Sequence, residues 1–425
     1  MSPDRPADAV PNSNQTGMPR GLGVLIAIAT AFAAANLYYV QPLLPALARD
    51  FAVSDSVIAL AMTAGQVGFV VGVLFLLPLG DALARNRLIP VMLTAVAAGQ
   101  LLTAATSTTV VVFVAAVIIG IGSAAAQVLV PFAGSLAPTE LRATVVARTV
   151  GALLTGILLA RLVSGVVATA AGWRAVYVGS AVILVVLAAA LLRYAPGENR
   201  TLVTRPHYRS LLTSMLTLLR TETWLRWIII SGAGTFGAFS MFWTAIPFLL
   251  AGDEYGWSPA QIGTLSLVGI GGILAARRVG PWYQRGLSRN VTILGLVLVV
   301  TAFALAIPGA HLLAAVATAA IVMDVGVQSV HAINQCTVVG YTEEIRSRAN
   351  AMYMTHYFLS GAIGSALAPW LAGAGGWTAV CLAGGGAVSV AAFAWVMLGR
   401  SLAPASRDSG TTSSRARPSP VGDVI

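Results

Sequence analysis

Four polar residues recur along one apolar segment and have the chemistry to carry protons or bind a solute. Asp324, Gln328, His331 and Gln335 are spaced at i, i+4, i+7 and i+11, so a helix would place them on one narrow face. Such a face lines a cavity or seals against another helix by hydrogen bonds, since lipid would leave it unsatisfied. We expect Asp324 to accept a proton, because a carboxyl group away from water tends to hold its proton, and His331 to assist it.

Arg161 is a cation deep inside another apolar segment, where a charge is costly and therefore points to a function. Arg277 and Arg278 are the other candidates for a buried cation, if they reach inward from the end of their segment. Arg161 either pairs with a carboxylate such as Asp324 or binds an anionic solute directly. Desolvation favours pairing, so we group Arg161 with the proton-coupling residues.

The composition excludes most soluble enzymes. Of 425 residues, 57% are hydrophobic and only 9% are charged, against about a quarter in an average soluble domain. All basic residues are arginine, which removes the Walker phosphate loop and any lysine nucleophile or Schiff base. Cys336 and Cys381 form no CxxC pair, and neither HExxH nor GxSxG occurs. We therefore expect no enzyme, no cofactor, no metal site and no nucleic-acid partner.

Charges and turn residues divide the chain into twelve apolar segments, each long enough for the roughly 20 residues of a membrane-spanning helix. The predicted fold is an all-α membrane protein with twelve transmembrane helices. The segments are 21–43, 55–79, 88–106, 108–132, 145–168, 173–193, 224–250, 259–280, 291–307, 312–339, 350–372 and 377–399. The polar start, a central arginine-rich stretch and the tail are expected to be solvated and poorly ordered.

A shift of 204 residues superposes the two halves of the sequence without a gap. Glu140-Leu-Arg142 aligns with Glu344-Ile-Arg346, Gly172-Trp173 with Gly376-Trp377, and Arg85-Asn86 with Arg289-Asn290. The chain is therefore predicted to hold two parallel six-helix bundles, at 21–193 and 224–399, joined by a linker at 194–223. Two such bundles suit alternating access around a site at their interface, although a duplicated scaffold without transport would share the pattern.

The duplication also predicts a cavity. Asn36 corresponds to Ser240, Tyr39 to Trp243 and Gln127 to His331, so four segments contribute polar or aromatic groups at equivalent positions. Such walls suit a moderately apolar organic molecule. A single aromatic residue, such as Tyr38 or Trp257, is more often packing or an interfacial anchor. The cavity residues we predict are Asn36, Tyr39, Gln127, Ser240, Trp243, Gln328, Tyr353, His356 and Tyr357.

The distribution of arginine predicts the orientation. With the N-terminus in the cytoplasm, nearly all arginines lie on the cytoplasmic side, as the positive-inside rule requires. Only Arg49 and Arg174 then lie outside. Residues 1–20 and 400–425 are predicted to be cytoplasmic tails.

The loop after the second segment, Gly80-Asp-Ala-Leu-Ala-Arg-Asn-Arg87, is predicted to form a gate. Asp81 can pair with Arg142 or Arg148 near a helix end. Such a cluster would hold the cytoplasmic faces together when the protein opens outward and separate when it opens inward. With the second copy included, the predicted gate residues are Gly80, Asp81, Arg85, Arg87, Arg142, Glu344 and Arg346.

This loop resembles the GxLaDrxGrr signature of the major facilitator superfamily, with Ala84 and Asn86 departing from it. The glycines and arginine of 151–165 are similar to the glycine-rich motif of drug:proton antiporters, without its central Gly-Pro. The segments 36–45 and 323–328 look like those of a largely uncharacterised subgroup. The chain thus resembles bacterial exporter-like members of the superfamily, of the drug:proton antiporter type, and the resemblance implies the major facilitator fold, with helices one, four, seven and ten lining the central site.

We therefore expect a multi-pass secondary transporter of the bacterial inner membrane that exports a small organic compound in exchange for protons and works as a monomer. Because no nucleotide motif is present, an ion gradient must supply the energy. The main competitor is an importer or facilitator of a small polar or anionic solute, with Arg161 as the anion site. A non-transporting receptor or an intramembrane enzyme is the remote alternative, and a closed core without a central cavity would favour it.

Overall fold

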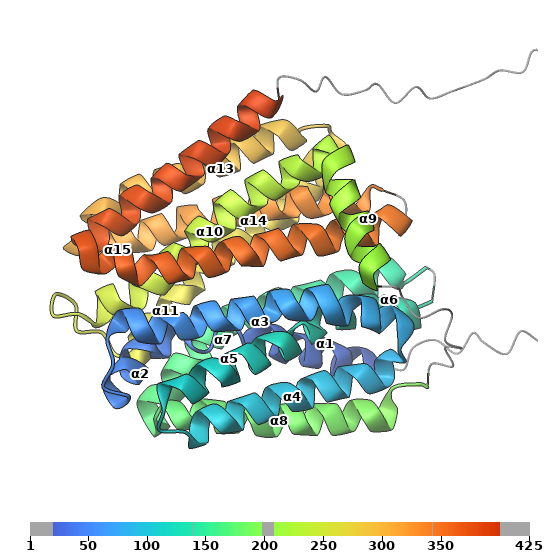
Figure 1. Ribbon diagram of the computed structural model, residues 1–425, viewed down its shortest axis with the longest axis horizontal. Coiled ribbons are helices and arrows are strands. Elements are labelled where there is room, and N and C mark those ends of the chain that lie inside the picture. Colours follow the sequence, from blue (N-terminus) through green and yellow to red (C-terminus); the bar gives the residue numbers. More distant parts are fainter. Residues whose placement is uncertain (1–19, 139, 198–207, 342, 400–425) are drawn as a thin grey trace, which may run out of the picture.

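The computed structural model describes residues 20–138, 140–197, 208–341 and 343–399, and these fold into long, roughly aligned helices (Figure 1). The helices of the first half are α1 (Arg20–Ala35), α2 (Leu44–Asp50), α3 (Asp55–Ala82), α4 (Arg85–Ala105), α5 (Thr109–Ser123), α6 (Ala125–Leu136), α7 (Arg142–Ala171) and α8 (Trp173–Tyr194). Those that follow are α9 (Tyr208–Thr221), α10 (Thr223–Ala251), α11 (Pro259–Leu265), α12 (Ile270–Gln284), α13 (Ser288–Ala306), α14 (Leu313–Val339) and α15 (Glu343–Gly399). Short 3₁₀ turns are η1 (Gln41–Leu43), η2 (Ser266–Gly269) and η3 (Ile307–Ala310).

The twelve-helix prediction is confirmed. Ten helical stretches of the described chain are long and apolar enough to span a membrane. One of these, Arg348–Met397, is broken at Gly375 and Gly376 and so comprises two spans. The shorter α1, continued past a turn by η1 and α2, is a further span. The ten stretches therefore contain eleven spans, and α1 with its continuation is the twelfth.

The helices form two bundles with equivalent pairings. In the first bundle α1 packs against α7, α3 against α5, and α4 against α8. In the second, α10 packs against α15, α12 against α14, and α13 against α15. Figure 1 shows the two bundles side by side, the first in blue to green and the second in yellow-green to red. The duplication seen in the sequence is therefore a duplication of structure.

The paired Gly-Trp positions show this equivalence most locally. Gly172 and Gly376 both adopt a positive φ, of 84° and 64°, which favours glycine. Each is followed by a tryptophan that begins a span. The Trp173 indole donates to Asp50 over 3.1 Å, and the Trp377 indole donates to the Ala306 carbonyl over 2.6 Å. The same turn thus closes each bundle at one end.

Three predicted spans are interrupted where function is expected. The first span leaves the α-helix after Ala35, turns through residues 36–40, and resumes in a stretch that contains Pro42 and Pro45, which cannot donate backbone hydrogen bonds. The fourth span is broken at Ala124, between α5 and α6. The eighth changes to the 3₁₀ turn η2 between α11 and α12. These breaks decide which side chains face the interface between the bundles.

Part of the linker differs from its prediction. We expected residues 194–223 to be poorly ordered, but residues 208–221 form α9, which packs against α10 and α15 with Met215 buried. Met215, Leu218 and Leu219 recur at helical spacing and pack against the core, so this face of α9 covers the second bundle. The tails at 1–19 and 400–425 lie outside the described residues.

Candidate functional site

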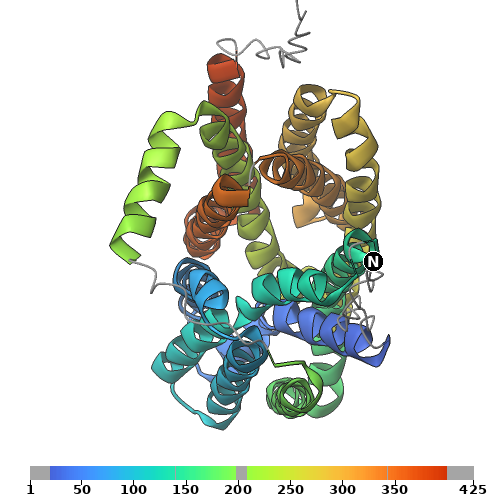
Figure 2. The ribbon, with the colours of Figure 1, turned by 90° about the vertical axis from the view of Figure 1, so that its right-hand side faces the viewer.

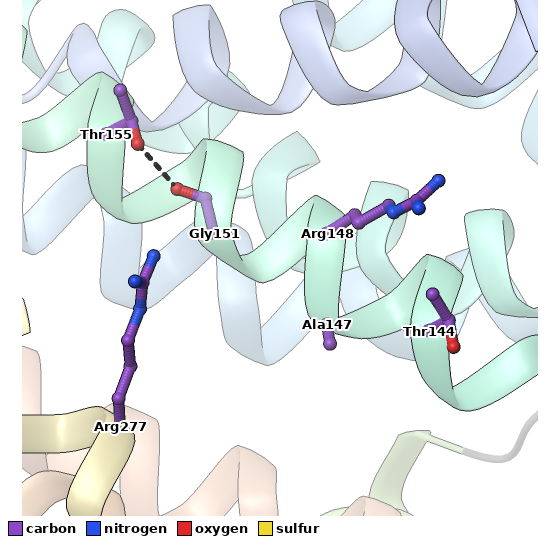
Figure 3. Close-up of a pocket in the computed structure, with 6 residues that line it drawn as sticks. All are labelled: Thr144, Ala147, Arg148, Gly151, Thr155 and Arg277. Carbon is purple, nitrogen blue, oxygen red and sulfur yellow. Dashed lines mark hydrogen bonds between the residues drawn. The ribbon is translucent and has the colours of Figure 1, made fainter.

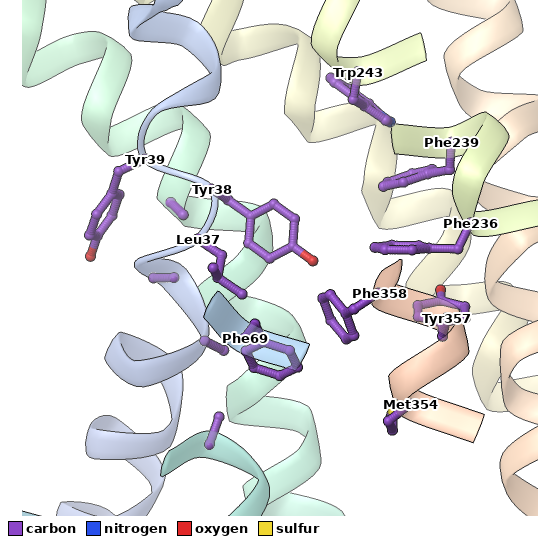
Figure 4. Close-up of a cluster of buried hydrophobic side chains, with 14 of the residues drawn as sticks. Leu37, Tyr38, Tyr39, Phe69, Phe236, Phe239, Trp243, Met354, Tyr357 and Phe358 are labelled. Carbon is purple, nitrogen blue, oxygen red and sulfur yellow. The ribbon is translucent and has the colours of Figure 1, made fainter. Parts of the chain in front are cut away.

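A cavity of about 100 Å³ lies between the two bundles. Aromatic rings from both bundles line it together with aliphatic side chains, and Figure 4 shows several of the rings facing one another across the interface. The Phe236 and Tyr357 rings stack at 3.9 Å, and the Phe69 and Phe358 rings meet at 4.1 Å. The polar lining residues are Gln127, Gln328 and His331, with the Tyr38 and Tyr357 hydroxyls.

The polar face of α14 points into the protein and contributes to this cavity. Gln328 and His331 line it, and His331 Nδ1 is 2.9 Å from the hydroxyl of the buried Tyr353. Asp324 lies one helical turn before Gln328 on α14 and is only 4% exposed. Its Oδ2 is buried without a hydrogen-bond partner, beside Gly269. The face therefore both lines the cavity and contacts other helices.

Arg161 lies in a box of aromatic rings next to this cavity. Its guanidinium carbon is 4.4 Å from the centre of the Trp243 ring, 5.0 Å from Tyr38 and 5.9 Å from Phe239. Tyr38 and Phe239 also line the cavity, so Arg161 sits directly behind its wall. The Arg161 Nε donates to Gln41 Oε1, while Nη2 is buried without a partner.

Arg161 and Asp324 interact electrostatically across the bundle interface. Among the described ion pairs, however, none joins them directly. Both are buried, and each has an unsatisfied polar atom. The two charges predicted from sequence are therefore brought together as neighbours without making a salt bridge in this conformation.

Two predicted cavity residues lie elsewhere. Asn36 accepts from Gln100 over 2.8 Å inside the first bundle, and Tyr39 points toward Ser180 in the same bundle, away from Tyr38 (Figure 4). The prediction assumed that both copies stay helical here. α10 does so through Ser240 and Trp243, but the first span turns at residues 36–40. The turn places Tyr38 at the cavity instead.

The other predicted cavity residues take varied positions. Ser240 accepts from Gln66 over 2.7 Å across the bundle interface, and Trp243 covers Arg161. Tyr353 stands behind His331. His356 Nδ1 lies 2.8 Å from the Met352 carbonyl of its own helix and does not line the cavity.

Sequence reasoning missed Gln41, Phe236 and Phe239, and treated Tyr38 as packing. A signal existed for the second bundle, because Phe236, Phe239 and Trp243 recur at i, i+3 and i+7 along α10. Gln41 and Tyr38 belong to an interrupted helix, for which periodicity gives no guidance.

The two ends of the molecule differ. We call the end where α9 lies and α1 begins the linker end, and the other the far end. Toward the far end the bundles are sealed by Thr63 with Ser365 at 2.9 Å, Gln66 with Ser240, and the Ala260 amide with Thr169 at 3.0 Å. At the linker end a cleft of about 660 Å³ separates α7 from α12 (Figure 3). Figure 2 shows the bundles apart in the view from this end.

The predicted gate residues lie at the open linker end. Arg87 and Arg142 are exposed, Arg85 is buried, and Arg346 donates to the Tyr341 carbonyl of its own bundle over 2.8 Å. Gly80, Asp81 and Glu344 lie outside the residues whose side chains are described. Arg148 and Arg277, from opposite bundles, line the open cleft instead.

Residues 26–276 and 228–424 match the model of the Major Facilitator Superfamily, and the chain belongs to this family. It is 38% identical to the uncharacterized transporter YgaY of Escherichia coli O157:H7 over 88% of this chain and 94% of the relative. It is 34% identical to a protein of Streptomyces coelicolor named as a probable transporter, SCO4007, over 88% and 85%. A bacterial homolog of the human lysosomal transporter Spinster, solved in an inward-facing and occupied conformation, superposes with a TM-score of 0.71 at 11% identity, over 90% of this chain and 97% of that one.

The protein is thus a multi-pass membrane protein and a secondary transporter of the Major Facilitator Superfamily, not an enzyme.

Proposed function

We propose that the transporter couples the movement of a small organic compound to protons and that Asp324 carries the proton. The observation that supports this is the buried Asp324 Oδ2, which lacks a hydrogen-bond partner beside the central cavity. An ionised carboxylate in such a place is poorly satisfied, whereas a protonated one loses most of the penalty. Its protonation therefore responds to which end of the protein admits water.

The position of Asp324 links this charge to the moving parts. Arg161, its electrostatic neighbour, binds Gln41 of the first bundle and faces Trp243 of the second. Adding or removing the proton changes the net charge beside Arg161, and so the stability of contacts that join the bundles. Charge and conformation are coupled in this way when the two states differ in their interaction with the same group. His331 assists through its contact with Tyr353.

We propose a bacterial inner-membrane location with both termini in the cytoplasm and a monomer as the functional unit. The linker end then faces the cytoplasm and the conformation is open to the inside. Arginines at the linker end, the exposed Arg87 and Arg142 and the cleft-lining Arg148 and Arg277, support this orientation through the positive-inside rule.

For the direction of transport, we propose export in exchange for protons, which the sequence favours. Uptake of a polar or anionic solute is a second candidate, and the surroundings of Arg161 favour it: the guanidinium has an unsatisfied nitrogen next to the cavity and no direct carboxylate partner among the described ion pairs. In exchange, solute and proton compete; in uptake with an anion, they bind together. The sign of the proton movement that accompanies solute binding separates the two.

The test uses the full chain in proteoliposomes loaded with a pH-sensitive dye and exposed to a panel of small organic compounds. At least one compound should move protons with the wild type and none with Asp324→Asn, while Asp324→Glu retains partial coupling. Asp55→Asn, an exposed carboxylate on α3, is the matched control and should behave as wild type. Solute movement by Asp324→Asn with normal proton movement would reject Asp324 as the carrier.

A further inference from the structure

Two hydrogen-bond donors beside the cavity have nothing to bind. Arg161 Nη2 and Gln41 Nε2 are both buried and without a partner, although Arg161 Nε is bonded to the oxygen of the same glutamine amide. The indole nitrogen of Trp243, whose ring covers the guanidinium, is also unsatisfied. Buried donors are nearly always satisfied in folded proteins, so a cluster of three indicates a missing acceptor.

A carboxylate fits this cluster best among common acceptors. Because Arg161 Nε is already bonded to Gln41, the two oxygens of a carboxylate can accept from Arg161 Nη2 and Gln41 Nε2, and the bond from the guanidinium is charge-assisted. Asp324 supplies no such contact in this conformation, because it forms no direct pair with Arg161 among the described residues. The acceptor is therefore expected to come with the solute.

The cavity wall defines the rest of the solute. Its rings, including Tyr38 and Phe239 in front of Arg161, are suited to stack against a flat apolar body. At about 100 Å³ the cavity is well below the roughly 300–1,000 Å³ of sites for drug-sized ligands. This size indicates a body of about one ring. At the open end, Arg148 and Arg277 flank the cleft and would raise the local concentration of anions.

We propose that the solute is a small organic anion, a carboxylate on a flat apolar body, held by Arg161 and Gln41 with its body between the aromatic walls. This inference rests on proton coupling through Asp324 and deepens the second candidate direction, uptake of an anionic solute, by naming the substrate class. Tyr38 and Phe239 must part to let the carboxylate reach Arg161.

Proton binding follows from the same site. Among the described residues, the charged or titratable groups that interact with Asp324 are Arg161 on α7 and Tyr357 on α15, with Tyr38 next to Arg161. A second negative charge beside an ionised Asp324 would be repelled, with only one arginine to neutralise both. The anion therefore binds together with a proton on Asp324, as in the second candidate direction, and failure of the anion site would leave the proposed export in exchange for protons untouched.

The experiment measures binding of matched probes to the full chain in lipid nanodiscs: benzoate with benzamide, and nicotinate with nicotinamide. Each acid should bind at least tenfold more tightly than its amide, a difference of about 1.4 kcal/mol. Arg161→Gln should remove this preference, and Arg161→Lys and Gln41→Ala should each reduce it. Trp243→Phe, which keeps a ring and removes the N–H, should weaken the acids a few-fold. Arg285→Gln, an exposed arginine of the second bundle, is the matched control and should leave the preference intact.

Equal binding of acids and amides overturns the inference, as does an intact preference in folded Arg161→Gln. If that variant does not fold, a preference unchanged in both Arg161→Lys and Gln41→Ala overturns it equally. Proton uptake on adding benzoate separates this inference from the proposed function. Binding that depends on Arg161 without proton uptake would reject proton coupling and keep the anion site. Proton movement through Asp324 with other compounds, but no preference for acids, would reject the anion site and keep proton coupling.

Discussion

The two bundles share their helix pairing and differ at the positions where chemistry would occur. By the 204-residue shift, Gly120 of α5 corresponds to Asp324 of α14, and Ala124 to Gln328. In the first bundle α5 packs closely against α3, and in the second α14 packs against α12. One copy uses this position to bring helices together, and the other uses it to place a carboxylate beside the cavity.

The backbone beside these two positions also differs between the bundles. A Cβ atom at Gly120 would lie 2.1 Å from the Gly65 carbonyl oxygen, so no side chain fits there. Asp324 lies next to Gly269, the counterpart of Gly65, on the 3₁₀ turn η2, whereas α3 is helical throughout. The seam between the bundles is unequal as well, since Arg161 on α7 corresponds to Ser365 on α15. The duplication therefore accounts for the helix packing that the two bundles share, whereas the buried charges come from positions where the two copies differ, Asp324 and Arg161.

The largest effect is expected from copying the carboxylate into the first bundle. Gly120→Asp should abolish folding or destabilise the protein by about 3–5 kcal/mol, because it buries an uncompensated charge where even Cβ clashes. Gly120→Ala should cost about 1–3 kcal/mol from overpacking, while Asp324→Asn should leave stability nearly unchanged. Thermal unfolding in detergent measures all three. A stable Gly120→Asp would mean that the two copies do not differ in space as described.

The next effect concerns the unequal pair at the seam. Arg161→Gln should lower proton-coupled transport on the order of tenfold or more, a loss of at least about 1.4 kcal/mol. Ser365→Ala, the equivalent position, should change it much less, because it removes hydrogen bonds to Thr63, Gln66 and the Ala362 carbonyl but no charge. Transport rates at equal expression provide the measurement. Equal losses of transport rate in both variants would show that transport depends on packing at the bundle interface and not on the charge of Arg161.

A smaller effect is expected from weakening the far-end seal. Thr63→Val and Gln66→Leu each remove a cross-bundle hydrogen bond of about 0.5–1.5 kcal/mol. Each should raise the population open at the far end by up to about tenfold. Spin labels on Ser56 and His311, exposed at that end, report the distance between the bundles. An unchanged distance distribution would show that these bonds do not hold the seal.

The smallest effects should distinguish two neighbouring tyrosines. Tyr38→Ala should weaken solute binding several-fold, because Tyr38 lines the cavity and covers Arg161. Tyr39→Phe should leave binding unchanged and cost about 1 kcal/mol of stability at most, because Tyr39 packs inside the first bundle. Binding titration and thermal unfolding of both variants check this. Weaker solute binding by Tyr39→Phe with unchanged binding by Tyr38→Ala would show that Tyr39, and not Tyr38, lines the cavity.

Much of the fold was predictable because its determinants are local. Span length, apolar composition and turn glycines such as Gly172 and Gly376 are written in short stretches of sequence, and a fixed shift exposed the duplication. Asp324 and Arg161 could be singled out for the same reason, since charges within apolar segments are rare.

The rest could not be predicted because it depends on packing between distant segments. The turn at residues 36–40 moved Tyr38 to the cavity and Asn36 and Tyr39 away from it. No periodicity indicates that Gln41 meets Arg161, or that Gln66 seals against Ser240, 174 residues away. Which end is open depends on the balance between two packings of the same sequence. The polar residues of the linker predicted a solvated segment, but its apolar residues let 208–221 form the helix α9.

Whether the charge of Asp324 controls which end is open can be measured without a known solute. Cysteines replace Thr144 on α7 and Arg277 on α12, which line the linker-end cleft from opposite bundles, after Cys336 and Cys381 are removed. Spin-label distances across the cleft are then recorded at acidic and alkaline pH. The distance distribution should change with pH in the protein that retains Asp324 and should be independent of pH in Asp324→Asn. An unaltered pH response in Asp324→Asn would contradict the account.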